Sequence, residues 1–118
     1  MLGVGAGTAL RHTIDGVTYR TFTAPAPAVR QASLAALERM GMEAGAAQTF
    51  EGGELIYATS RNRTIEIELE PISAKATRLR IAAKNGGFFY DSATAAEIIA
   101  QTERLLDSSA RGATSANF

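Results

Sequence analysis

The chain has 118 residues, of which 46% are hydrophobic and 20% are charged. This length suits one domain with a single hydrophobic core, and the composition excludes an intrinsically disordered chain. Twelve basic and twelve acidic residues give a formal net charge of zero, so the electrostatic attraction on which nucleic-acid binding depends is missing. The absence of cysteine excludes disulfides, thiolate nucleophiles, cysteine-ligated zinc and iron–sulfur clusters within this chain.

Residues 1–16 are expected to form a flexible lead-in. Gly3, Gly5 and Gly7 are spaced as in a dinucleotide-binding fingerprint, but that motif needs a strand before it and a helix after it. Here "RHTIDG" follows instead. The single histidine, His12, is therefore predicted to be a solvated linker residue, because a catalytic histidine must be held rigidly against its partners.

The folded domain is predicted to span residues 17–107 and to begin with a strand and a helix. In "VTYRTF", residues 17–22, β-branched and aromatic side chains dominate an alternating pattern, which is typical of a strand. Prolines 25 and 27 end this strand, and proline is tolerated in the first turn of a helix. Residues 27–40 then place an apolar stripe on one helical face: Val29, Ala32, Ala36, Leu37 and Met40. Gly41 can end the helix in the left-handed conformation.

Four strands joined by turns are predicted next. The segment 42–50, "MEAGAAQTF", is a weak strand, and "ELIYATS", residues 54–60, follows a Gly-Gly turn. Arg61-Asn62 should form another tight turn, in which asparagine tolerates positive φ. The strands "TIEIELEP" and "ATRLRIA" alternate strictly between a core face and a wet face. The core face carries Ile65, Ile67, Leu69, Thr77, Leu79 and Ile81, and the wet face carries Glu66, Glu68, Glu70, Arg78 and Arg80.

The charged wet face is interpreted as structural. In a hairpin the glutamates lie opposite the arginines, and each such pair contributes about 0.2–1 kcal/mol and opposes a slip in register. Glutamates about 7 Å apart on a flat strand do not wrap a metal ion. An RNA-binding face is also disfavoured, because the positions between the arginines hold glutamates and not stacked aromatics. The arginines considered for such a face are Arg61, Arg63, Arg78 and Arg80.

A second helix is predicted from Ser92 to Asp107. Its apolar stripe consists of Ala95, Ile98, Ile99, Thr102, Leu105 and Leu106. Asp91 or Ser92 can cap its start, and Thr94 with Glu97 offers a competing capping box one turn later.

The order of elements predicts an α+β fold. One strand, one helix, four strands in hairpins and a last helix give a two-layer sandwich. Its antiparallel sheet of about five strands should carry both helices on its apolar face. Residues 108–118 are small and polar and are expected to form a disordered tail.

The junction "NGGFFYDS" before the second helix is the candidate site. Glycines before a helix can form an anion site from backbone N–H groups, but Asp91 at the cap would compete for the same donors. The aromatic residues can pack on the first helical turn as a structural corner. Alternatively, Phe88, Phe89 and Tyr90 form an exposed patch that binds a partner, because consecutive residues point in different directions and cannot easily all be buried.

The blocks "TFTAPAPAVRQASLAALERMGM" and "TRLRIAAKNGGFFYDSATAAEII" resemble those of a family of small bacterial envelope lipoproteins of unknown function. The shared residues are Ala24, Pro25, Val29, Ala32, Ala36, Leu37 and Gly41 in the first block, and Thr77, Leu79, Ile81, Asp91, Ile98 and Ile99 in the second. The resemblance covers residues 17–106. Tyr90 stands where the family's G-D-x-x-x-S-x-x-I block has glycine, and the family's lipidated cysteine is absent from this chain. The resemblance implies export and tethering to a bacterial membrane, facing the periplasm.

These features favour a non-enzymatic accessory or protein-interaction domain that is membrane-tethered in its native form. Its partner would be an envelope protein that contacts Phe88, Phe89 and Tyr90. No nucleic acid, cofactor or metal is expected, and the membrane would be reached only through a lipid anchor. Without a signal sequence encoded upstream, the cytoplasm is the expected location.

Three other possibilities remain open from the sequence. The protein could carry a small apolar or amphiphilic ligand between helices and sheet, where the alanines of the first helix leave room. An enzyme would need Asp91, Tyr90 and a glutamate in one cleft. A homodimer could form through an exposed edge strand, either 17–22 or 42–50.

Overall fold

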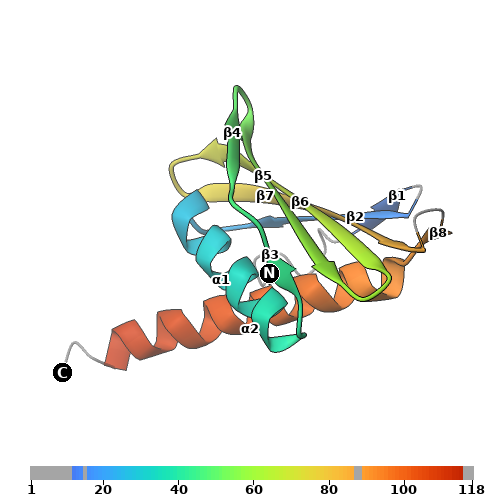
Figure 1. Ribbon diagram of the computed structural model, residues 1–118. Helices are drawn as coiled ribbons and strands as arrows, with labels where there is room; N and C mark the ends of the chain where they lie inside the picture. Colours follow the sequence, from blue (N-terminus) through green and yellow to red (C-terminus); the bar gives the residue numbers. More distant parts are fainter. Residues whose placement is uncertain (1–11, 15, 87–88, 116–118) are drawn as a thin grey trace.

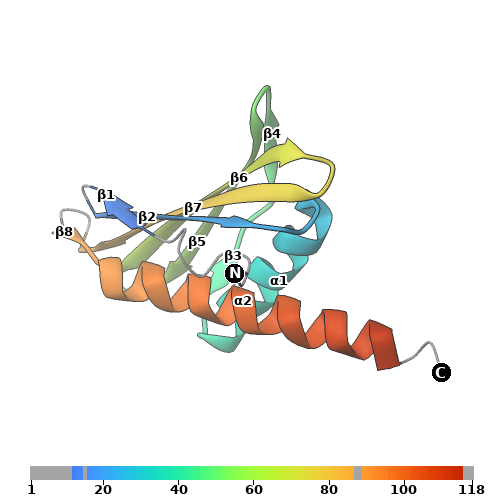
Figure 2. The same ribbon diagram turned by 180° about the vertical axis from the view of Figure 1, so that it is seen from behind.

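The computed structural model describes residues 12–14, 16–86 and 89–115. The elements are β1 (His12–Ile14), β2 (Val17–Phe22), α1 (Ala26–Arg39), β3 (Glu43–Ala44), β4 (Gln48–Phe50), β5 (Gly53–Ser60), β6 (Arg63–Ser73), β7 (Ala76–Asn85), β8 (Phe89–Tyr90) and α2 (Ser92–Ser115). Both helices lie on one side of a single sheet (Figure 1). Seen from behind, α2 runs beneath the sheet and its C-terminal part projects beyond it (Figure 2).

The sheet is antiparallel throughout, and the α+β sandwich predicted from the sequence is confirmed. Its strand order is β1-β2-β7-β6-β5-β3, while β4 also pairs with β5 and β8 also pairs with β7. The prediction of about five strands missed the short elements β1 and β8 and treated β3 and β4 as one strand. The principal strands β2, β5, β6 and β7 agree with strands predicted from the sequence.

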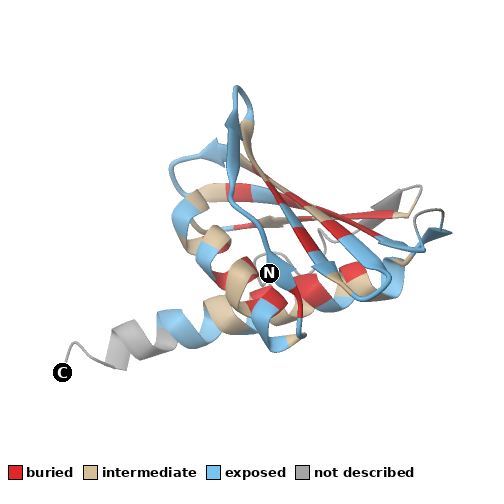
Figure 3. Cartoon of the chain, in the orientation of Figure 1, coloured by how far each residue is buried: buried red, intermediate tan, exposed pale blue. Residues whose placement is uncertain are grey.

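The β6–β7 hairpin has the predicted register. Its core-facing pairs include Ile67↔Ile81 and Leu69↔Leu79, and its wet-face pairs are Glu68↔Arg80 and Glu70↔Arg78. Both residues of each of these core pairs are almost completely buried. Figure 3 shows such buried residues gathered where the sheet meets the helices. Burying one such side chain contributes about 1.5–3 kcal/mol. The helices therefore cover this apolar face of the sheet and leave the charged face to solvent.

Helix α1 packs the predicted stripe on the sheet. Pro25 occupies the N-cap position, and the helix ends before Gly41, which has the expected positive φ of 75°. The sequence analysis missed Ser33, which is buried on the same face and donates a 2.7 Å hydrogen bond to the carbonyl of Val29. This bond supplies the hydroxyl with an acceptor in the apolar layer.

Helix α2 is longer than predicted. Four residues of its stripe are buried, namely Ala95, Ile98, Ile99 and Thr102, whereas Leu105 and Leu106 are half-buried. The helix then continues to Ser115. The sequence predicted a disordered tail over residues 108–118, and this prediction is wrong for residues 108–115, which are helical. Residues 116–118 lie outside the described part of the chain.

Three further predictions are corrected. Part of the predicted lead-in forms β1, which pairs with β2 through His12↔Tyr19 and Ile14↔Val17. The segment 42–50 is divided into β3 and β4, which both pair with β5. At the β5–β6 turn the positive φ belongs to Arg61, at 50°, and not to Asn62.

Candidate functional site

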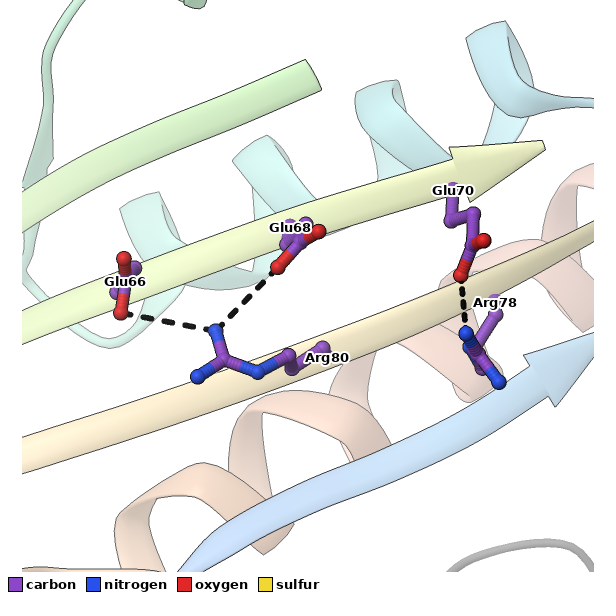
Figure 4. A network of polar contacts seen from close by, with 5 residues as sticks. All are labelled: Glu66, Glu68, Glu70, Arg78 and Arg80. Carbon is purple, nitrogen blue, oxygen red and sulfur yellow. Dashed lines mark hydrogen bonds and ion pairs between the residues drawn. The ribbon is translucent and has the colours of Figure 1, made fainter. Parts of the chain in front are cut away.

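The wet face of the sheet carries a network of ion pairs (Figure 4). The Arg80 guanidinium lies 3.6 Å from the carboxylate of Glu66 and 3.4 Å from that of Glu68, and Arg78 pairs with Glu70. Partial burial opposes the charge on Arg80, but a hydrogen bond with Tyr19 and the two nearby carboxylates outweigh it and raise the pKa of Arg80. The network therefore neutralises the centre of this face and holds its register, as predicted.

The four arginines considered for an RNA-binding face do not form one basic patch. Arg78 and Arg80 pair with glutamates on the sheet, whereas Arg63 pairs with Asp91 at 2.9 Å. Arg61 lies exposed in the β5–β6 turn. Their charges are thus divided between the middle and one end of the sheet.

Asp91 caps helix α2. Its carboxylate accepts hydrogen bonds from the Thr94 amide at 3.0 Å, the Thr94 hydroxyl at 2.7 Å and Arg63 Nε at 2.9 Å. The Thr94 hydroxyl and the Arg63 guanidinium, in that order, hold the pKa of Asp91 below its ordinary value near 3.8. The capping box of Thr94 with Glu97 does not form, because the Thr94 hydroxyl donates to Asp91 and Glu97 contacts Gln101 and Arg104 instead.

Phe89 and Tyr90 form an exposed feature at the end of the sheet, named here the aromatic corner. Phe89 is 75% exposed and Tyr90 is 49% exposed. They pair with β7 through Asn85↔Phe89 and Lys84↔Tyr90, so by strand alternation their side chains point to opposite faces. Phe88, the third residue of the predicted contact surface, lies outside the described residues.

Tyr90 is held in place from two sides. The ammonium group of Lys84 lies 5.3 Å from the centre of its ring. On another side is Gly16, where an added Cβ would come within 2.5 Å of Tyr90 Cβ and Cγ. The backbone of Asp91 adds a 2.7 Å hydrogen bond to the Ala83 carbonyl. The corner is therefore a fixed part of the fold, although its rings face solvent.

A partly buried ion pair, which was not predicted from the sequence, joins β2 to α2. Arg20 is only 6% exposed, and it donates to Glu103 through Nη1 at 2.9 Å and Nη2 at 2.7 Å. Its guanidinium carbon lies 5.0 Å from the centre of the Phe22 ring. Arg20 Nε, however, is buried and makes no hydrogen bond to the described part of the chain. The sequence signal for this pair is the position of Arg20 two residues before Phe22, which places both side chains on the same face of the strand.

A groove of about 340 Å³ adjoins this pair. Its lining residues are Arg20, Phe22, Thr23, Ala24, Ala28, Glu103, Leu106, Asp107, Ser109 and Ala110. A second hollow of about 290 Å³ lies between the two helices and shares Ala28, Leu106 and Ser109 with the first. The two hollows are therefore adjacent. The sequence predicted room between the helices and the sheet, whereas the second hollow lies between α1 and α2, where Ala28, Ala32 and Ala35 line it.

The carboxylates that were considered for an enzyme make separate structural contacts. Asp91 caps α2, while Glu66, Glu68 and Glu70 pair with arginines on the sheet. His12 belongs to a strand and not to a linker. Among the side chains described, residues 16–86 and 89–110, no cluster of at least three His, Cys, Asp or Glu is placed to hold a metal ion.

Comparison of the chain with protein-family models gave no match, and none of the curated proteins searched matches it. The resemblance to envelope lipoproteins thus stays a prediction. Neither helix, over the residues described, combines the length and apolar character that a bilayer-spanning helix requires.

Proposed function

We infer that the protein is a non-enzymatic interaction domain that binds an envelope protein through its aromatic corner and is membrane-tethered in its native form. The observation that carries this proposal is the 75% exposure of Phe89 on a strand with fixed backbone pairing. Exposed aromatic side chains on a preorganised backbone are favoured anchors, because little conformational entropy is lost when they bind. The location rests on the family resemblance.

The charged residues around the aromatic corner indicate the chemistry of the partner's contact surface. Lys84 is exposed beside Tyr90, and Arg61 is exposed in the β5–β6 turn. That turn is tied to the end of β7, the strand with which the corner pairs, by a 2.9 Å hydrogen bond from the Gly86 amide to the Asn62 carbonyl. The complementary surface is therefore an apolar pocket for Phe89 with carboxylates at its rim.

Site-specific photo-crosslinking tests the contact. A photoreactive residue at position 89 should give one discrete adduct in intact cells, whereas the same residue at Phe50, an exposed aromatic on β4, should not. The substitution Lys84→Glu should weaken the adduct at position 89 because it reverses the charge at the rim. Equal labelling from positions 89 and 50 would show that the corner is not the contact surface.

The tether is tested independently. The DNA upstream of Met1 should encode a signal sequence and a cysteine, and the native protein should fractionate with membranes. Recovery of the native protein in the cytoplasmic fraction would contradict the membrane tether. The crosslinking experiment would still test whether the aromatic corner is the contact surface.

A further inference from the structure

The floor of the groove holds a charged group with an unused donor. Arg20 is almost completely buried, its Nη1 and Nη2 atoms bond Glu103, and its Nε has no partner in the described residues. A planar guanidinium recognises carboxylates especially well, since its N–H donors form a fork that matches two carboxylate oxygens. The present partner, the Glu103 side chain, is 34% exposed, so its carboxylate can turn into solvent when a ligand carboxylate takes its place on Arg20.

Beside these charged groups, the groove is lined by apolar side chains from three parts of the fold. Phe22 and Ala24 lie at the end of β2, Ala28 lies on α1 and Leu106 lies on α2. Beyond Ala28 and Leu106 the second hollow continues between the helices along Ala32 and Leu105. Together the hollows fall in the size range of small-molecule sites, roughly 300–1,000 Å³.

We propose that this groove binds a free single-chain amphiphile with a carboxylate head group. The carboxylate replaces Glu103 on the Arg20 fork, and the alkyl chain lies over Leu106 and between α1 and α2. The exchange leaves the charge of the buried site unchanged, because one carboxylate replaces another. Asp107 at the groove together with the displaced Glu103 disfavours ligands that carry a second negative charge. This site lies on the helices and β2, apart from the aromatic corner.

Isothermal titration of the full chain with dodecanoate, kept below its micellar concentration, tests the proposal. Removing the competing carboxylate by Glu103→Gln should tighten binding about tenfold, because an internal charge-assisted partner no longer opposes the ligand. Glu97→Gln is the matched control, since Glu97 lies on the same helix and pairs at the surface with Arg104. It should leave binding unchanged, and dodecanol should bind the wild-type protein at least about tenfold more weakly than dodecanoate.

A second variant tests the position of the alkyl chain. Ala28→Leu fills the point where the two hollows meet, and it should abolish dodecanoate binding while circular dichroism shows an intact fold. Dodecanoate binding that is equal in wild type, Glu103→Gln and Ala28→Leu would overturn the proposal. A second result would also overturn it: no dodecanoate binding, together with a wild-type dimer in sedimentation experiments that Ala28→Leu converts to a monomer. The occupant of the groove would then be a second copy of the chain.

Discussion

Arg20 and Glu103 lie 83 positions apart in the sequence, yet their side chains meet in a two-pronged ion pair with hydrogen bonds of 2.9 and 2.7 Å. Arg20 is on the helix-facing side of β2, where its neighbours in the register are the core residues of β7. A charge at such a position needs a partner, because its transfer from water is costly. Glu103 supplies this partner from the edge of the α2 stripe and so ties the first long strand to the last helix.

The substitution Glu103→Leu should lower the free energy of unfolding by about 2 kcal/mol, since it leaves the buried Arg20 charge unpaired while Glu103 itself is partly solvated. Urea denaturation at neutral pH measures this loss. Glu97→Leu removes an exposed pair with Arg104 and should change stability by less than about 1 kcal/mol. Equal losses in the two variants would show that the Arg20–Glu103 pair does not stabilise the fold.

The substitution Gly16→Ala should destabilise the protein by about 2–3 kcal/mol. The residue has a φ of 82°, and the added Cβ would lie within 2.5 Å of Tyr90. Gly86→Ala is the control, since Gly86 has a φ of 70° with no atom within 4 Å of an added Cβ; it should cost only about 1–2 kcal/mol.

A double-mutant cycle separates the steric clash from the backbone strain at Gly16. In a Tyr90→Ala background the cost of Gly16→Ala should fall towards that of Gly86→Ala. An unchanged cost, measured by urea denaturation, would mean that Tyr90 does not pack on Gly16.

The substitution Ile67→Ala should cost about 2–5 kcal/mol, because it opens a cavity in the layer between sheet and helices. Ile72→Ala is a matched change in the same strand at a side chain that is 54% exposed, and it should cost less than about 1 kcal/mol. Thermal and urea unfolding of the pair measure the difference. Similar costs would contradict the assignment of Ile67 to the core face.

Asp91 should make the stability depend on acid pH. Its folded-state pKa lies below the ordinary value near 3.8, so its contribution is fully present above that value and is lost as the pH falls through the folded-state pKa. Asp91→Asn should therefore flatten the decline of the free energy of unfolding below about pH 4. Arg63→Gln should flatten it partly, because one of the donors to the carboxylate is removed. Parallel curves for wild type and Asp91→Asn would refute this role.

Local periodicity was sufficient to predict the hairpin of β6 and β7 and the buried stripes of both helices. In β6, isoleucines and leucine alternate with glutamates, so only one face can be buried at low cost and the register follows from the charges. In α1, apolar residues recur at helical spacing between proline and Gly41. These features are encoded by neighbours in sequence, and the structure agrees with them.

The face of β2 that turns inward was decided only by tertiary structure. Val17, Tyr19 and Thr21 are as apolar a set as Thr18, Arg20 and Phe22, so the alternation left both orientations possible. Pairing with β7 and a carboxylate from α2 select the second set for the core side. The short strands β1 and β8 and the groove beside Leu106 have the same origin. Each depends on a partner distant in sequence, and a local pattern carries no information on contacts that form only after the chain has folded.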